Sequence, residues 1–223
     1  MNTIHHRKNG RKTRKNKYNH VMMPPKSIND YITHIIYINL DKRPDRKERI
    51  EKQLSVFEPS KITRIPGIIH KNPAIGCAMA HIQALKMAKK HGWPNVLILE
   101  DDSVWSNVTK SYPIFEKLVN QPYDVIMLGG TYPRWYEKSY RVKHALSACA
   151  YLVHHSYYDK LIETVEHGLH TRDSSGHNIA VNVSFTKLQP TDNWLLIRPA
   201  LMIQAKSYSN IIGSVVNYKK FFK

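Results

Sequence analysis

The chain has 223 residues, of which 42% are hydrophobic, and a formal net charge of +17. This length suffices for one sizeable core, so we expect a single domain over residues 27–223. No apolar run reaches the roughly 18–20 residues that cross a bilayer, and the first residues lack the apolar core of a signal peptide. With only two cysteines, a disulfide framework is excluded, and a cytoplasmic protein without a transmembrane segment is expected.

Residues 1–26 form a basic segment with eight lysines and arginines and no acidic residue. The segment has no apolar periodicity and cannot bury enough surface to offset its ordering entropy, so a disordered tail is expected. Its charge suits an anionic partner such as nucleic acid, anionic lipid or an acidic protein. A solubilising arm without a specific partner is the alternative, because a basic tail indicates charge and no particular ligand. A nucleic-acid-binding protein that uses the tail is a less favoured interpretation, since the rest of the chain has no recognised RNA- or DNA-binding motif.

Strand and helix patterns alternate along the first half of the domain. Residues 34–40 are rich in β-branched and aromatic side chains, which predicts a buried strand. A charged segment follows, in which Pro44 suits the first turn of a helix and apolar residues at four-residue spacing continue it to about Phe57. Next we expect a strand over 62–65, a helix from Ile75 to His91 closed by Gly92, and a strand over 96–99.

The second half continues this alternation less regularly. Expected here are strands over 124–128, 148–154, 194–197 and 201–204, a helix over 157–167 ending at Gly168, and a loop over 170–178. Such an alternation predicts an α/β fold with a mostly parallel sheet flanked by helices.

Three carboxylates, Glu100, Asp101 and Asp102, directly follow the strand expected over residues 96–99. Their mutual repulsion is commonly relieved by a hard divalent cation, often shared with a substrate phosphate. The carboxyl ends of strands are also where open α/β sheets bind ligands. An acidic junction between a strand and a loop is the alternative interpretation.

The first expected strand ends in Asn39 and Leu40 and runs into two basic residues, Arg43 and Arg46. Two guanidiniums and the free amides of a helix start suit the diphosphate of a nucleotide. The alternative is that the arginines cover a helix face and pair with neighbouring acids.

A second candidate anion site is the helix start at Gly76, where glycine permits a close backbone approach. His81, one turn further, is a candidate donor to a phosphate or ribose oxygen, or a wall of a sugar pocket. Lys86 could add positive charge on the same helix. Without these companions, a histidine on a helix face is more often a structural residue.

Together these blocks resemble glycosyltransferase family 25, which includes lipooligosaccharide and collagen galactosyltransferases. The resemblance is carried by YINLDKRPDR at 37–46, by GCAMAH at 76–81 with LILEDD at 97–102, and more weakly by KLQ at 187–189 with Pro199, Gln204 and 209–211. It implies a GT-A-like, Rossmann-related domain. The implied reaction is transfer, with inversion and dependent on Mn²⁺ or Mg²⁺, of a hexose from UDP-galactose or UDP-glucose to a hydroxyl of a glycan or glycoprotein acceptor.

The resemblance also implies roles for individual residues. Asp102 would bind the metal directly, with Glu100 and the neutral oxygen of Gln204 as further candidate ligands, and Glu100 or Asp101 would contact ribose or metal-bound water.

An aromatic group follows two glycines without clean periodicity: Tyr132, Trp135, Tyr136 and Tyr140. Aromatic faces pack on sugar C–H groups, which suggests a mobile acceptor lid, although at least two of the four are expected to pack on the core.

The acceptor side departs from the family pattern. Asn182 stands where relatives commonly carry an aspartate, and Asn210 replaces a second one, so a proton acceptor becomes an amide. Ala80 replaces a family serine. Asp192 and Asp173 are candidate substitutes for a general base. The alternative function is therefore a catalytically silent module that binds a nucleotide sugar but has lost its acceptor-side carboxylates.

Overall fold

Successive side chains of the central strands enter two different apolar layers, because neighbouring residues of a strand point to opposite faces. Ile36 and Ile98 lie in one layer, whereas Ile35 and Leu97 lie in the other. The computed structural model describes residues 27–172, 174, 176 and 178–222, so the basic tail lies outside the described residues.

Six strands form the central sheet in the order β2-β1-β3-β8-β5-β9. Every pairing is parallel except the two made by β8, which runs antiparallel to both neighbours. The predicted α/β architecture with a mostly parallel sheet is therefore confirmed. The strands are β1 (His34–Asn39), β2 (Ile62–Pro66), β3 (Asn95–Glu100), β5 (Val125–Met127), β8 (Ala150–His154) and β9 (Trp194–Leu196).

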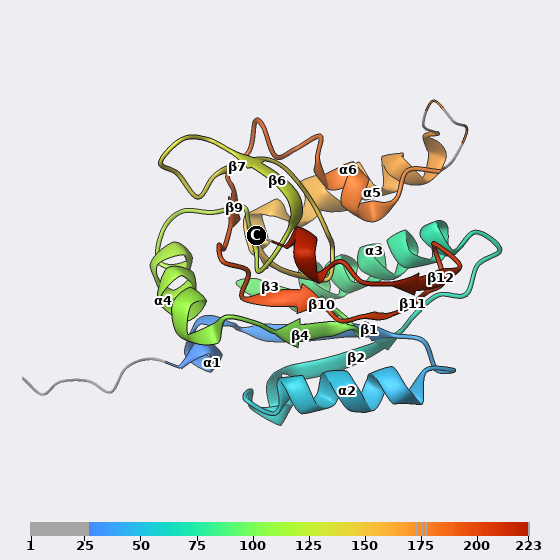
Figure 1. Ribbon diagram of the computed structural model, residues 1–223, viewed down its shortest axis with the longest axis horizontal. Helices are drawn as coiled ribbons and strands as arrows, with labels where there is room; N and C mark the ends of the chain where they lie inside the picture. The colour runs from blue at the N-terminus through green and yellow to red at the C-terminus, as the bar shows by residue number, and fades with distance from the viewer. Residues whose placement is uncertain (1–26, 173, 175, 177, 223) are drawn as a thin grey trace, which may run out of the picture.

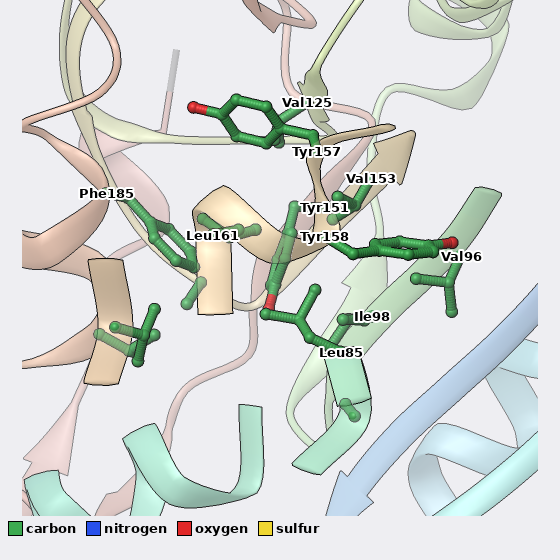
Figure 2. Packing of buried hydrophobic residues seen from close by; sticks show 14 of the residues in the cluster. Leu85, Val96, Ile98, Val125, Tyr151, Val153, Tyr157, Tyr158, Leu161 and Phe185 are labelled. Atoms are coloured by element: carbon green, nitrogen blue, oxygen red, sulfur yellow. The ribbon is translucent and has the colours of Figure 1, made fainter. Parts of the chain in front are cut away.

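Helices cover both faces of this sheet (Figure 1). They are α1 (Ile28–Tyr31), α2 (Pro44–Leu54), α3 (Pro73–His91), α4 (Val108–Val119), α5 (Tyr158–His170) and α6 (Val181–Phe185). Apolar residues of α3, α5 and α6 share one core layer, and those of α2 and α4 share the other. Figure 2 shows the first layer, in which Tyr151 of β8 lies among Leu85, Leu161 and Phe185.

Helix α3 begins two residues earlier than the apolar pattern indicates. The side chain of Asn72 accepts a hydrogen bond from the Ala74 amide at 3.0 Å, and Pro73 occupies the first helical position. Gly92 ends the helix in the left-handed conformation, with φ of 64°, as predicted.

Helix α5 corrects one expectation, because it continues through Gly168 to His170. A Cβ atom on Gly168 would lie 2.3 Å from Oγ of Ser184 on α6, so the glycine allows two helices to approach closely. Its role is packing and not termination.

Several further elements lie outside the central sheet, and apart from the strand expected over 201–204 they carry no clear sequence pattern. Two hairpins, β6 (Thr131–Trp135) with β7 (Val142–Leu146) and β11 (Ser207–Ser209) with β12 (Ser214–Val216), and the pair β4 (Ser103–Trp105) with β10 (Met202–Gln204) lie outside the central sheet. The described residues also contain three short 3₁₀ turns: Pro59–Lys61, His155–Tyr157 and Lys219–Phe221.

The predicted aromatic lid is thus largely the β6–β7 hairpin. Its register shifts between Thr131 and Trp135, which explains why no strand period was visible. The guanidinium of Arg198 lies 4.3 Å from the ring centre of Trp135 and 5.5 Å from that of Tyr140, while Tyr132 is half exposed.

Among the described residues, no helix combines the length and apolar character needed to span a bilayer.

Two glycines in and after α3 allow a test of this packing. A Cβ on Gly76 would lie 2.2 Å from the carbonyl oxygen of Ile68, whereas a Cβ on Gly92 meets nothing within 4 Å. We expect Gly76→Ala to lower the free energy of unfolding by about 1–3 kcal/mol, because backbone must shift. Gly92→Ala should cost about 1 kcal/mol through its positive φ alone.

Urea unfolding monitored by circular dichroism measures both effects. Asparagine tolerates the left-handed conformation, so Gly92→Asn should recover most of the loss at that position. Asparagine at position 76 should recover nothing, because the steric conflict with Ile68 remains. Wild-type stability of Gly76→Ala would contradict this account of the loop that covers α3.

Candidate functional site

The acidic cluster lies where two parallel strands end side by side. β1 and β3 pair in register with Ile38 opposite Glu100, so Asn39 and Asp101 are neighbours one residue later. Nδ2 of Asn39 donates a hydrogen bond to Oδ2 of Asp101 at 2.8 Å, and Nε of Arg64 donates to Oδ1 of Asn39 at 3.2 Å. Both ends of the Asn39 amide are therefore used to position the cluster.

Arg46 reaches the same cluster from α2. Its Nη1 donates to Oδ1 of Asp101 at 2.7 Å and lies 3.3 Å from Oδ2 of Asp102. Its Nη2 donates to Oγ of Ser207 and to the carbonyl of Tyr208, each at 2.7 Å. One largely buried guanidinium thus compensates two carboxylates and also holds β11 against the site.

Asp102 is the least compensated acid of the cluster. Oδ2 accepts hydrogen bonds from Nε2 of Gln204 at 3.0 Å and Oγ of Ser207 at 3.4 Å, but Oδ1 is buried without a partner. Burial, together with the charge of Glu100, raises the pKa of Asp102 to about 7. A buried carboxylate oxygen without a donor is what a hard divalent cation would satisfy, so the residues present fit such an ion.

Glu100 stands between the cluster and α3. Its side chain keeps 24% of its exposure, and Oε1 lies 3.4 Å from Nε2 of His81 and 3.9 Å from Sγ of Cys77. His81 itself is fully buried, with Nδ1 2.7 Å from the hydroxyl of Tyr151. His81 therefore lies behind Glu100, and a direct contact with a phosphate or sugar, as the sequence suggested, does not follow from its position.

Two adjoining cavities open beside these residues. The first, of about 340 Å³, has a wall that combines the acids with positive groups, among them Lys42 and Arg46. Of the residues singled out from sequence, its lining includes Leu40, Arg46, Gly76, Glu100, Asp101, Asp102 and Gln204. This cavity therefore brings both predicted phosphate-binding blocks together with the predicted metal ligands.

The second cavity, of about 410 Å³, shares five lining residues with the first: Cys77, Glu100, Gln204, Ser209 and Ile211. Asn182, at the start of α6, lies in its wall, and so does Tyr132 of the β6–β7 hairpin. Among the described residues that line it, Glu100 is the one carboxylate. A ligand that occupied both cavities would cross this shared boundary, at which Glu100 is the one charged residue.

Gly76 permits a close backbone approach, but the approaching group belongs to this chain and not to a ligand. The contact is the Ile68 carbonyl over the first turns of α3. The early α3 amides are also engaged: Asn72 accepts from Ala74 with its side chain and from Ile75 and Gly76 with its carbonyl. The free-amide argument for an anion at this helix start therefore does not hold.

Other predicted site residues lie apart from both cavities. Arg43 pairs with Asp45 at 2.8 Å, and Lys86 pairs with Glu166 at 2.7 Å. Asp192 accepts hydrogen bonds from the hydroxyl of Tyr157 at 2.5 Å and from Lys160, whose Nζ lies 2.6 Å away. Neither Arg43, Lys86 nor Asp192 lines the two cavities, and Asp173 lies outside the described residues.

Sequence reasoning missed Ser207 and Cys77 as members of the site. Cys77 was visible inside the GCAMAH block, next to Gly76. Ser207 carried no local signal, because its contact with Asp102 depends on how the chain returns to the cluster after β10.

A larger cavity, of about 660 Å³, lies away from the acidic cluster and is lined by residues around Asn95, Tyr123 and His154. Its acids already cap backbone amides: Asp124 accepts from the Asn193 amide at 2.8 Å and Asp30 from the Ser27 amide at 2.7 Å. It offers no uncompensated carboxylate comparable to Asp102 among the described residues.

The chain matches no known family model and no curated protein. Structures with a similar chain trace include a glycosyltransferase involved in the glycosylation of the major capsid of PBCV-1, with 12% identity, a TM-score of 0.48, and 79% of this chain and 94% of that one covered. A mannose-1-phosphate geranyltransferase from Thermus thermophilus has 10% identity and a TM-score of 0.48, with 74% and 73% covered.

A third structure, 4-diphosphocytidyl-2C-methyl-D-erythritol synthase from Anaerococcus prevotii, has 12% identity and a TM-score of 0.42, with 81% and 76% covered. These similarities are too distant to carry an argument about activity, and none supports glycosyltransferase family 25 in particular. The α/β fold described above rests on the strand order itself.

The raised pKa of Asp102 gives a test of the cluster in protein without added metal. The folded state holds the Asp102 proton more tightly than the unfolded state, whose pKa is near 3.8. The contribution of Asp102 to the free energy of unfolding is therefore fully present below about pH 4, and it is lost as the pH rises to about 7. Asp102→Asn should remove this pH dependence. Between about pH 4 and pH 7, the free energy of unfolding of the variant should rise relative to that of wild type by a few kcal/mol, on the order of 1.4 kcal/mol per pKa unit.

Urea unfolding in the presence of EDTA at about pH 4.5 and about pH 8 measures the difference. Asp101→Asn is the matched control, because Asp101 has donors in Asn39 and Arg46 and its neutralisation should destabilise at both pH values. Parallel pH profiles for Asp102→Asn and wild type would show that Asp102 is not a strained carboxylate.

Proposed function

We propose that this chain is a metal-dependent glycosyltransferase that moves a hexose, galactose or glucose, with inversion from a UDP-sugar to a hydroxyl acceptor, in the manner of glycosyltransferase family 25. The observation that carries the proposal is the cluster of Glu100, Asp101 and Asp102 on the wall of the first cavity, with Oδ1 of Asp102 buried and unpartnered. Asp102, Glu100 and the side-chain oxygen of Gln204 are the groups that would hold Mn²⁺ or Mg²⁺. When bound there, such a cation would supply positive charge to a departing nucleoside diphosphate.

Positive groups on the same wall support a diphosphate ligand. Lys42 and Arg46 line the first cavity together with the acids, so the wall offers both signs of charge. The guanidinium of Arg46 is already engaged by Asp101, Ser207 and Tyr208, so it would contribute positive charge to this wall, whereas Lys42 offers a flexible point charge. A diphosphate carries more negative charge than a sugar, which is why this cavity, rather than its neighbour, is the proposed nucleotide side.

The second cavity is the proposed acceptor side. It adjoins the first at Cys77, Glu100 and Gln204. A sugar held at this junction would therefore face the nucleotide on one side and the acceptor on the other. Its wall is largely uncharged, and Tyr132 offers an exposed aromatic face of the kind that packs on sugar C–H groups. A glycan or glycoprotein hydroxyl is the class of acceptor that such a wall would suit.

One observation favours a second candidate function. Asn182 is the candidate catalytic residue that borders the acceptor cavity, and an amide cannot take a proton from a hydroxyl. Asp192 is engaged by Tyr157 and Lys160 away from the cavity. The alternative is therefore a module that binds a nucleotide sugar and does not transfer it.

The two functions differ in one assay, UDP release from UDP-galactose or UDP-glucose with Mn²⁺. For an active enzyme, release should depend on metal and fall by about 10²-fold or more in Asp102→Asn. For a silent module, calorimetry should detect Mn²⁺-linked UDP binding without release. In that case Asn182→Asp should raise release by as much as the ~10²- to 10⁴-fold of acid–base catalysis.

Asp159→Asn is the matched control, because Asp159 is an exposed acid paired with Lys89 on the outside of the helices. Its neutralisation should leave both UDP binding and release at wild-type levels. Absence of metal-linked UDP binding in the wild-type chain would refute both candidate functions together.

A further inference from the structure

A cysteine, a histidine and a glutamate from two elements meet between the two cavities. Cys77 and His81 are four residues apart on α3 and therefore share a helix face, and Glu100 ends β3. Their sulfur, ring-nitrogen and carboxylate-oxygen atoms lie within 4.8 Å of one another. We propose that these three side chains form a binding site for Zn²⁺, separate in chemistry from the hard-cation ligands around Asp102.

The spacing of the ligand atoms fits a tetrahedral ion with little movement. Zinc bonds of roughly 2.0–2.3 Å place two ligand atoms about 3.3–3.8 Å apart. Oε1 of Glu100 is already 3.4 Å from Nε2 of His81 and 3.9 Å from Sγ of Cys77. Small rotations of Cys77 and Glu100, both partly exposed, would complete the arrangement around the fully buried His81.

The donor types select the metal class. A thiolate with an imidazole favours Zn²⁺, whereas Mn²⁺ and Mg²⁺ prefer sets made of oxygen. Cys77 and His81 supply the soft and borderline donors, and Asp102 with Gln204 supplies oxygen. Glu100 is the one residue that both sets would use.

A polar contact behind the trio fixes the histidine in the required orientation. Nδ1 of His81 is 2.7 Å from the hydroxyl of the buried Tyr151, which leaves Nε2 directed at Glu100. Metal-bound histidines usually bond through their second ring nitrogen to such a partner. A tyrosine hydroxyl can accept as well as donate, so this contact persists when Nδ1 carries the ring proton.

The site is also accessible. Cys77 and Glu100 line both cavities, so an ion can enter from solvent and a fourth ligand position faces the cavities. Binding replaces the S–H bond of Cys77 by an S–Zn bond, and the proton leaves to solvent. No oxidant or reductant takes part.

Cobalt(II) absorption of the full chain tests the proposal, because a thiolate ligand gives a near-ultraviolet sulfur-to-cobalt band. We expect one equivalent of Co²⁺ to give this band with intense visible bands of a tetrahedral site, and Zn²⁺ to abolish both. The chain has two cysteines, so the band can be assigned: Cys77→Ser should remove it, and the matched control Cys149→Ser should retain it. Histidines elsewhere in the chain give no sulfur band.

A weaker variant tests the geometry without removing a ligand. Tyr151→Phe should keep the sulfur band but lower Zn²⁺ affinity by about 10- to 100-fold, the usual effect of losing a group that orients a metal ligand. Cys77→Ala serves as a second ligand variant, and circular dichroism without metal verifies that each variant is folded.

Two outcomes would overturn the proposal. If wild type binds Co²⁺ without a sulfur band, the ion lies on the carboxylates around Asp102 or elsewhere. If the band persists in Cys77→Ser and disappears in Cys149→Ser, the thiolate ligand is the other cysteine. Neither outcome bears on UDP binding with Mn²⁺, so this test and that of the proposed function can fail separately.

Discussion

The site depends on one electrostatic constraint, the burial of adjacent carboxylates with a single guanidinium between two of them. Arg46 compensates Asp101 fully and Asp102 in part, since Oδ1 of Asp102 has no donor. Removing such charges from water costs several kcal/mol per ion unless they are paired. An arrangement of this kind serves stability poorly and suits a site that receives positive charge from a ligand.

The fold builds this arrangement from four separate parts of the chain. The parallel pairing of β1 and β3 puts Asn39 beside Asp101, and α2 carries Arg46 back over the same edge. The chain around β10 and β11 supplies Gln204 and Ser207, which both donate to Asp102. Because these contacts are mutual, the cluster also ties the C-terminal hairpin to the central sheet.

Glu100 has a special position in this scheme, because it borders both cavities and contacts the residues of α3. The acids beyond it form an oxygen-rich set that suits a hard cation, while Cys77 and His81 form a softer set that suits zinc. Two cations would compete for one carboxylate. Under the two proposals, the chemistry of the junction would depend on which ion Glu100 binds, and on whether Asn182 leaves the second cavity without a base.

The sequence alone determined the parts that depend on local pattern. β-Branched runs predicted β1 and β3, helical spacing with Gly92 predicted α3, and the acidic run after a strand marked the cluster. Tertiary structure decided everything that depends on distant partners. It buried His81 behind Glu100, engaged Asp192 with Lys160, and brought Ser207 to Asp102 across 105 positions of sequence. Periodicity reports which face of an element is apolar, whereas a polar side chain acquires its partner only when the layers pack.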